Sequence, residues 1–241
     1  MILYKRNSLP FGSIAIEILC LLIFAAANLR AQGKEDAELQ RILTQMDAVR
    51  KNCSSFTARF SQKKYTAILK EFDTPETGEF YFSRDKRGST LLRKETTSPG
   101  REILTIKGDE ATDYQPDIKQ AKKVSLGKYK DAAEFLALGI CQSPAKLQET
   151  FSISYQGSEL LNGSPCSVII LKPKTSKLAA SVSSITLWYK KSNGLPIQNK
   201  LQEPSGDYHL LSFFDEKLNV KISNSKFEQK LAGDVEILKI Q

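Results

Sequence analysis

Residues 78–84 read Gly78-Glu79-Phe80-Tyr81-Phe82-Ser83-Arg84, a short stretch rich in aromatic side chains. Aromatic residues favour β-strands, and successive side chains of a strand point to opposite faces of the sheet. Phe80, Phe82 and Arg84 therefore share one face. The stretch predicts a half-buried strand in which a row of aromatic rings ends in a positive charge.

The same period of two extends in both directions from this strand. Upstream, Phe56, Ala58 and Phe60 alternate with polar residues. Downstream, short strand signals are separated by turn signals such as Asn162-Gly163 and Asn193-Gly194. The further segments predicted as strands are 67–72, 90–95, 102–106, 111–114, 119–125, 151–156, 166–172, 184–190, 196–203, 208–219 and a late strand around Phe227. About ten or eleven strands at hairpin spacing favour one curved antiparallel sheet.

Two segments have a helical period instead. Between residues 35 and 51 the apolar side chains recur every three or four residues and form one stripe. A second helical segment is predicted over residues 131–150, with a new start at Ser143-Pro144, where serine can cap and proline can open a helix. The predicted fold is therefore mainly β with helices: an incomplete, half-open antiparallel β-barrel covered by a helical lid.

The first 31 residues have the pattern of an export signal. Lys5 and Arg6 precede an apolar run from Ile14 to Ala27, and small residues follow. The run is shorter than the ~20 residues of a membrane-spanning helix and contains Glu17. We expect cleavage after Ala27 or Ala31, an exported protein, and one mature domain over residues 32–241.

Charge and composition disfavour several functions. The chain has a net charge of +8, but its lysines are scattered among acids, which disfavours nucleic-acid binding. Its single histidine, His209, lies in an alternating strand without a nearby nucleophile or paired acid, so we expect no catalytic residues, no metal and no cofactor.

Three cysteines follow the signal: Cys53, Cys141 and Cys166. In an exported protein, one disulfide and one free thiol are expected. Cys141 and Cys166 are the predicted pair, and three buried thiols are the alternative.

Several motifs in order make the chain resemble the LolA family of periplasmic lipoprotein carriers. The motifs are the amphipathic helix leading into residues 55–63, the 78–84 strand, the Gly108 turn before residues 113–116, residues 170–174, Leu195-Pro196 and the late Phe227. The resemblance implies a monomeric periplasmic chaperone and not an enzyme. Such a chaperone receives the acyl chains of lipoproteins from an inner-membrane lipoprotein-releasing ABC transporter and delivers them to an outer-membrane acceptor. The alternative is a module or envelope sensor of the same fold that handles another lipid or a glycolipid.

The resemblance also suggests site residues. In the family, an arginine at the position of Arg84 bonds to the backbone of the lid and holds the empty cavity shut; the simpler interpretation is a strand-end arginine with its charged head in water. Asp85 stands where the family usually has proline, and it could pair with Arg84. The residues predicted to contact cargo are apolar residues of the expected inner face, although each could equally be ordinary core: Phe56, Phe60, Phe80, Phe82, Phe135, Val168, Ile170, Leu187 and Leu210.

Overall fold

The structure is a computed structural model that describes residues 32–85, 88–126 and 139–240. The predicted export signal, residues 1–31, lies outside the described residues, as does the first part of the second predicted helical segment.

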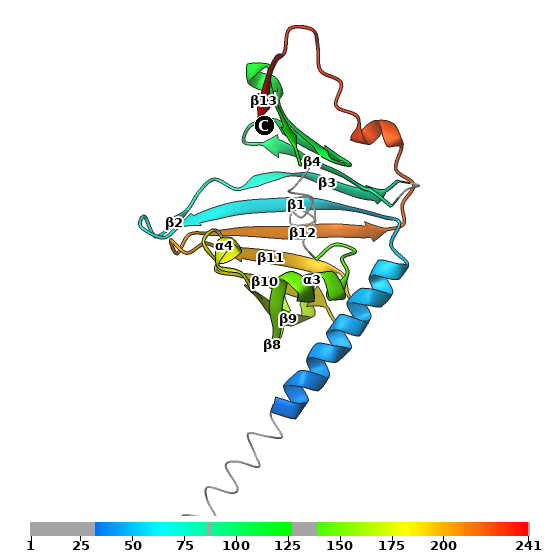
Figure 1. Cartoon of the computed structure of the whole chain (residues 1–241), viewed down its shortest axis with the longest axis vertical. Coiled ribbons are helices and arrows are strands. Elements are labelled where there is room, and N and C mark those ends of the chain that lie inside the picture. Colours follow the sequence, from blue (N-terminus) through cyan, green and yellow to red (C-terminus); the bar gives the residue numbers. More distant parts are fainter. Residues whose placement is uncertain (1–31, 86–87, 127–138, 241) are drawn as a thin grey trace, which may run out of the picture.

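One curved sheet of 13 strands organises the described chain (Figure 1). Its order is β13-β7-β6-β5-β4-β3-β1-β12-β11-β10-β9-β8, with the short β2 paired to β1. The strands are β1 Ser55–Thr66, β2 Glu71–Phe72, β3 Glu76–Arg84, β4 Thr90–Ser98, β5 Glu102–Lys107, β6 Glu110–Gln115, β7 Gln120–Ser125, β8 Phe151–Leu161, β9 Ser164–Pro173, β10 Ser184–Lys190, β11 Pro196–Gln202, β12 Tyr208–Leu218 and β13 Glu236–Ile240.

The predicted half-open barrel is confirmed, because the sheet ends in two different strands, β8 and β13, and does not close on itself. Neighbouring strands are antiparallel except for β13, which runs parallel to β7. The strand predicted over residues 67–72 is largely wrong, because residues 67–70 form a turn and only Glu71–Phe72 pair with β1, as β2. The strand β13, which pairs with a strand more than a hundred residues earlier in the chain, was not predicted.

The helices lie against one part of this sheet. Residues 32–51 are helical, and the side chains of Ile42, Leu43 and Met46 on the predicted stripe are buried. The helix α3 (Pro144–Thr150) starts as expected, since Ser143 accepts a hydrogen bond from the Lys146 backbone N–H. The described residues also form α4 (Ser176–Ala179) and the 3-10 helices η1 (Pro116–Ile118) and η3 (Asn224–Phe227). The expected late strand around Phe227 is wrong, because Phe227 ends η3.

The core forms three clusters of buried side chains. The first lies on β1, β3–β6 and β12, and the second lies between the helical residues 32–51, α3 and strands β8–β10. A third, smaller cluster surrounds Trp188. Since Trp188 alternates with Leu187 and Tyr189 of the second cluster, the third cluster lies on the opposite face of the sheet.

Candidate functional site

An apolar row crosses the inner face of the sheet from β1 to β6. The strand register pairs Phe56 with Phe82, Phe82 with Leu92, Leu92 with Ile106, and Ile106 with Ala111. Residues directly opposite each other on neighbouring strands point to the same face. All five are buried in the first cluster, so the row is continuous.

Phe56 of this row packs against two further aromatic rings, Phe80 and Phe213. The centroids of Phe56 and Phe213 are 5.8 Å apart, and those of Phe80 and Phe213 are 5.7 Å apart, each pair edge to face. Phe56 and Phe80 lie 6.4 Å apart in the same geometry. Edge-to-face packing favours such close rings. Among the described residues, these three rings occupy the part of the inner face next to the row, so a ligand that lay there would have to displace them.

Farther along the strands the same face becomes charged. Phe80 pairs with Lys94, and the row continues through Leu104 and Asp113 to Lys122. The Lys94 ammonium lies 2.9 Å from a Glu76 carboxylate oxygen and 5.0 Å from the centroid of the Phe60 ring. The inner face is therefore amphipathic, with an apolar end at Phe82 and a charged end beyond Phe80.

Two acids at the charged end are partly desolvated. Burial raises the pKa of Glu102, and the nearby Asp113 carboxylate raises it further. Burial also raises the pKa of Asp113, although Lys122 and Lys94 oppose the shift. Within the described part of the chain, His, Cys, Asp and Glu side chains form no group of three that could hold a metal ion.

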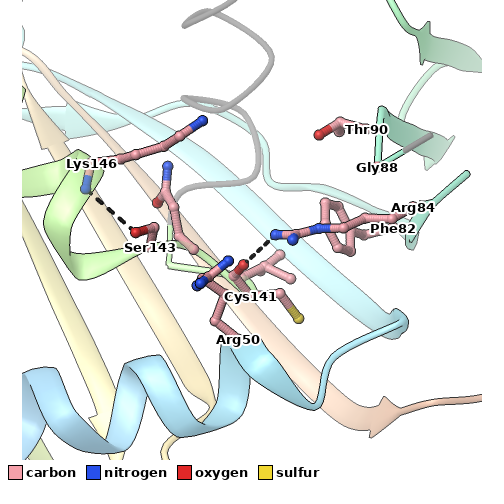
Figure 2. A pocket seen from close by; sticks show the side chains of 10 residues that line it. Arg50, Phe82, Arg84, Gly88, Thr90, Cys141, Ser143 and Lys146 are labelled. Carbon is pink, nitrogen blue, oxygen red and sulfur yellow. Dashed lines mark hydrogen bonds between the residues drawn. The ribbon is translucent and has the colours of Figure 1, made fainter.

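Arg84 ends the aromatic row of β3 and contacts the segment that covers its apolar end (Figure 2). Its Nη2 donates a hydrogen bond of 2.7 Å to the backbone carbonyl of Cys141, and its guanidinium carbon lies 5.8 Å from the Phe82 ring centroid. The expected shared face of Phe80, Phe82 and Arg84 is confirmed, because both rings are buried in the first cluster and Arg84 reaches a residue of that cluster.

A small polar pocket surrounds this contact. It has a volume of about 110 Å³ and is lined by Arg50, Phe82, Arg84, Gly88, Thr90, Ile140, Cys141, Gln142, Ser143 and Lys146 (Figure 2). Such a volume holds several water molecules and is too small for an acyl chain. Asp85, the residue after Arg84, closes a turn with Ser89, whose backbone N–H donates to the Asp85 carboxylate at 2.8 Å.

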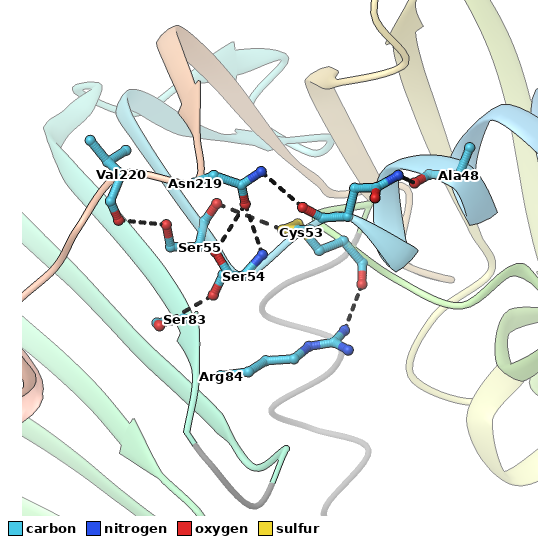
Figure 3. The surroundings of a disulfide bond; sticks show 10 residues. Ala48, Cys53, Ser54, Ser55, Ser83, Arg84, Asn219 and Val220 are labelled. Carbon is cyan, nitrogen blue, oxygen red and sulfur yellow. Dashed lines mark hydrogen bonds between the residues drawn. A yellow bond between two sulfur atoms is a disulfide. The ribbon is translucent and has the colours of Figure 1, made fainter.

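A disulfide joins Cys53 to Cys141, with the two Cα atoms 5.8 Å apart and a sequence separation of 88 (Figure 3). The predicted pairing of Cys141 with Cys166 is wrong. Cys166 is a buried free thiol in the cluster around Trp188, on the opposite face of the sheet. The expectation of one disulfide and one free thiol is confirmed.

Asn219 secures the chain where the helical residues 32–51 lead into β1 (Figure 3). Its side-chain oxygen accepts hydrogen bonds from the Ser54 backbone N–H at 2.9 Å and the Ser54 hydroxyl at 3.0 Å, while its amide donates to the Asn52 carbonyl at 2.8 Å. Ser55 in turn donates to the Val220 carbonyl at 2.7 Å. These bonds position Cys53, and through its disulfide they fix the acceptor of Arg84.

The structure separates the residues that the sequence suggested for cargo contact. Phe56, Phe60, Phe80 and Phe82 lie together in the first cluster. Leu187 belongs to the second cluster, against the helices. The remaining residues are dispersed: Val168 lies on the opposite face with Trp188, Ile170 and Leu210 are half-buried outside the clusters, and Phe135 lies outside the described residues.

Sequence reasoning missed Phe213, Leu92 and Ile106, which complete the first cluster. Phe213 lies three residues after Leu210 in β12, so the two side chains point to opposite faces of the sheet. Only one of them can therefore belong to the inner face, and this alternative could be seen in the sequence. The register confirms that parity: Phe213 is opposite the buried Phe60, whereas Leu210 is opposite Lys63.

A large unclosed antiparallel sheet, with helices against part of its apolar face, defines the class of half-open β-barrel proteins. The chain belongs to the family described as outer membrane lipoprotein carrier protein LolA, which it matches over residues 51–230. Proteins of this family are carriers or binders and not enzymes. No curated protein sequence matches the chain.

Solved structures share the fold at low sequence identity. A conserved protein from Thermus thermophilus has a TM-score of 0.54 and 12% identity over 84% of this chain and 99% of its own. MucB has a TM-score of 0.52 and 13% identity over 84% of this chain, which spans 66% of the MucB chain. The Mycobacterium tuberculosis lipoprotein LppX has a TM-score of 0.50 and 13% identity over 78% of this chain and 100% of its own.

No helix in residues 32–85, 88–126 and 139–240 combines the length and the apolar character needed to cross a membrane.

Proposed function

We propose that this protein is a periplasmic carrier that binds the acyl chains of lipoproteins released from the inner membrane and delivers them to the outer membrane. The observation that carries the proposal is the covered apolar row under Arg84 and Cys141, in a chain of the LolA family. An inner-membrane ABC transporter would load the carrier, and an outer-membrane acceptor would unload it.

The amphipathic inner face suits an amphipathic cargo. Acyl chains would replace the contacts among Phe56, Phe80 and Phe213 at the apolar end. The polar backbone and glycerol of the lipidated cysteine would lie toward Lys94 and Asp113, where charged groups replace apolar ones. Phe135 stays a proposed contact, while the positions of Val168, Ile170 and Leu210 favour a structural role.

The contact between Arg84 and the Cys141 carbonyl would keep binding reversible. Each buried methylene of an acyl chain contributes ~0.8 kcal/mol, so a lipid with several chains would bind too tightly to be released unless the empty state were also stabilised. A hydrogen bond from a charged donor contributes roughly 1.5–3 kcal/mol. Closing Arg84 onto Cys141, together with repacking the three rings, would offset part of the cargo's binding energy when the cargo leaves.

Release of lipoprotein from spheroplasts tests the proposal. Added to spheroplasts that make a radiolabelled triacylated lipoprotein, the purified protein should bring the label into the soluble fraction as a 1:1 complex. The same lipoprotein with its acylated cysteine replaced should not be bound. Mass spectrometry of the native protein provides a second test. Co-purified free lipid or glycolipid, without bound lipoprotein, would contradict the carrier proposal and favour the alternative lipid-binding module.

A further inference from the structure

The turn between β1 and β2 exposes two consecutive aliphatic side chains. Ile68 is 88% exposed, the highest value among the large hydrophobic residues that the structure describes, and Leu69 is 62% exposed. Exposed single aliphatic residues are common, but two adjacent exposed aliphatic side chains on a turn are unfavourable if the turn contacts only water.

This turn is held firmly in its exposed position. The Ala67 backbone N–H donates to the Asp207 carboxylate at 2.9 Å, which ties the turn to the neighbouring hairpin between β11 and β12. At its base, the Lys64 backbone N–H donates to the Asp73 side chain at 2.7 Å, and the Asp73 N–H donates to the Lys64 carbonyl at 2.9 Å. The exposure of Ile68 and Leu69 is thus a feature of a braced hairpin and not of a frayed end.

An aromatic layer lies directly behind the two aliphatic residues. Tyr65 stacks on Tyr208 with 4.8 Å between ring centroids, and Phe72 packs edge-on against Tyr65 and Tyr208 at 5.2 and 5.7 Å. Two ammonium groups cover these rings: Lys63 lies 3.9 Å from the Phe72 centroid and Lys200 lies 4.1 Å from the Tyr208 centroid. From the tip of the turn inward, the hairpin therefore presents aliphatic side chains, then aromatic rings, then ammonium groups.

The hairpin lies at the opposite end of β1 from Arg84 and the disulfide (Figure 1). The strand β1 has 12 residues, so the two ends are separated by roughly 35–40 Å. A surface that holds the hairpin would leave the covered apolar row and its Arg84 contact free.

We propose that this hairpin is a membrane-contact tip that inserts Ile68 and Leu69 into the surface of a lipid bilayer. The aromatic rings would lie at headgroup depth, where Tyr and Phe side chains are well accommodated, and Lys63 and Lys200 would face lipid phosphates. Attraction by charge plays the smaller part, because the hairpin region also carries the acids Glu71, Asp73 and Asp207, and Asp207 already pairs with Lys64 at 3.4 Å.

A bilayer suits this tip better than a protein partner. A specific protein interface buries about 800 Å² on each side, far more than two side chains on a turn supply. A bilayer needs no complementary shape, and a small aliphatic insertion gives weak, reversible binding. This membrane contact does not depend on the proposed carrier function, since the protein without cargo would itself bind the bilayer surface.

Flotation with vesicles tests the tip. The purified protein without cargo should float with vesicles of phosphatidylethanolamine and phosphatidylglycerol. The double variant Ile68→Ser/Leu69→Ser should bind at least about tenfold more weakly, because it loses the apolar area of two aliphatic side chains. Ile118→Ser is the matched control: Ile118 is also 62% exposed but lies in η1, after β6, which is four strands from β1 in the sheet, and its replacement should leave flotation unchanged.

Fluorescence quenching gives a readout that does not depend on overall affinity. Vesicles with brominated acyl chains should quench the emission of Ile68→Trp and leave that of Ile118→Trp unchanged; the buried Trp188 is common to both. Equal flotation of the parent and the double serine variant, or equal quenching at positions 68 and 118, would overturn the proposal. Loss of flotation with retained lipoprotein release from spheroplasts would support the tip and leave the carrier function intact.

Discussion

Arg84 donates a 2.7 Å hydrogen bond to the backbone carbonyl of Cys141, and Cys141 is covalently joined to Cys53 at the end of the N-terminal helical segment. The strand that carries the aromatic row is thereby connected to the segment that covers it. The acceptor is a main-chain atom, so the contact depends on where the segment lies and not on which side chain it carries. The disulfide determines that position.

Replacing Arg84 should favour the loaded state. Arg84→Leu removes the donor to Cys141, so the empty state loses roughly 1.5–3 kcal/mol and the cargo-bound state loses less. We expect a triacylated lipopeptide to bind about tenfold or more tightly and to transfer correspondingly more slowly to acceptor membranes. Competition with a fluorescent lipid and a transfer assay measure the two effects. Arg101→Leu, at a 56% exposed arginine far from the site, is the control. Transfer from Arg84→Leu at the parent's rate would refute the role of this contact.

Removing the disulfide should destabilise the protein and loosen the Arg84 acceptor. A cross-link between residues 88 positions apart contributes about 2–5 kcal/mol. We expect Cys53→Ser/Cys141→Ser to unfold at lower urea concentration, and dithiothreitol to shift the parent toward the same midpoint. The double variant itself should not respond to dithiothreitol. Peptide mapping that found Cys141 joined to Cys166 would contradict the structure.

Phe213 and its neighbour Phe214 should differ sharply in their effect on stability. Phe213 is 1% exposed between Phe56 and Phe80, whereas Phe214 is 37% exposed on the other face of β12. Phe213→Ala should cost about 3–5 kcal/mol, and Phe214→Ala should cost less than about 1 kcal/mol. Urea unfolding measures both. Similar losses would mean that the inner and outer faces of β12 are assigned incorrectly.

Glu102 should make the protein less stable as the pH rises above the ordinary carboxyl pKa. Burial raises the pKa of Glu102 above its usual 4.5, so the unfolded chain releases this proton at a lower pH than the folded protein does. Folding is therefore favoured below that pH, and this contribution is lost as the pH rises through the folded pKa. Glu102→Gln removes the effect.

The difference in unfolding free energy between Glu102→Gln and the parent should accordingly grow in favour of the variant from about pH 4 to pH 7. Glu149→Gln, on the exposed face of α3, should parallel the parent over this range. A constant difference between Glu102→Gln and the parent would show that the burial of Glu102 has no energetic effect.

Much of the fold could be predicted from local patterns. The alternation of Phe80, Phe82 and Arg84 correctly assigned them to one face, and the apolar stripe over residues 35–51 correctly predicted a helix that packs on the sheet. Turn signals at hairpin spacing predicted an antiparallel sheet that does not close. These features depend on the repeat of the backbone, which a strand or helix imposes over a few residues.

Other features depended on contacts between distant parts of the chain. Alternation shows that Val168 and Ile169 face opposite sides, but only packing reveals that Ile169 meets the helices and Val168 meets Trp188. The partner of Cys141 likewise follows from the approach of the N-terminal segment to β3, across 88 residues of sequence.

The sequence by itself therefore determined the class of fold, the shared face of Phe80, Phe82 and Arg84, and the arginine at the end of the aromatic row. The tertiary structure alone decided what covers that row, where Arg84 finds its acceptor, and that Ile68 and Leu69 project from a braced hairpin. The physical reason is that backbone periodicity acts over a few residues, whereas covering, cross-linking and exposure depend on the path of the whole chain.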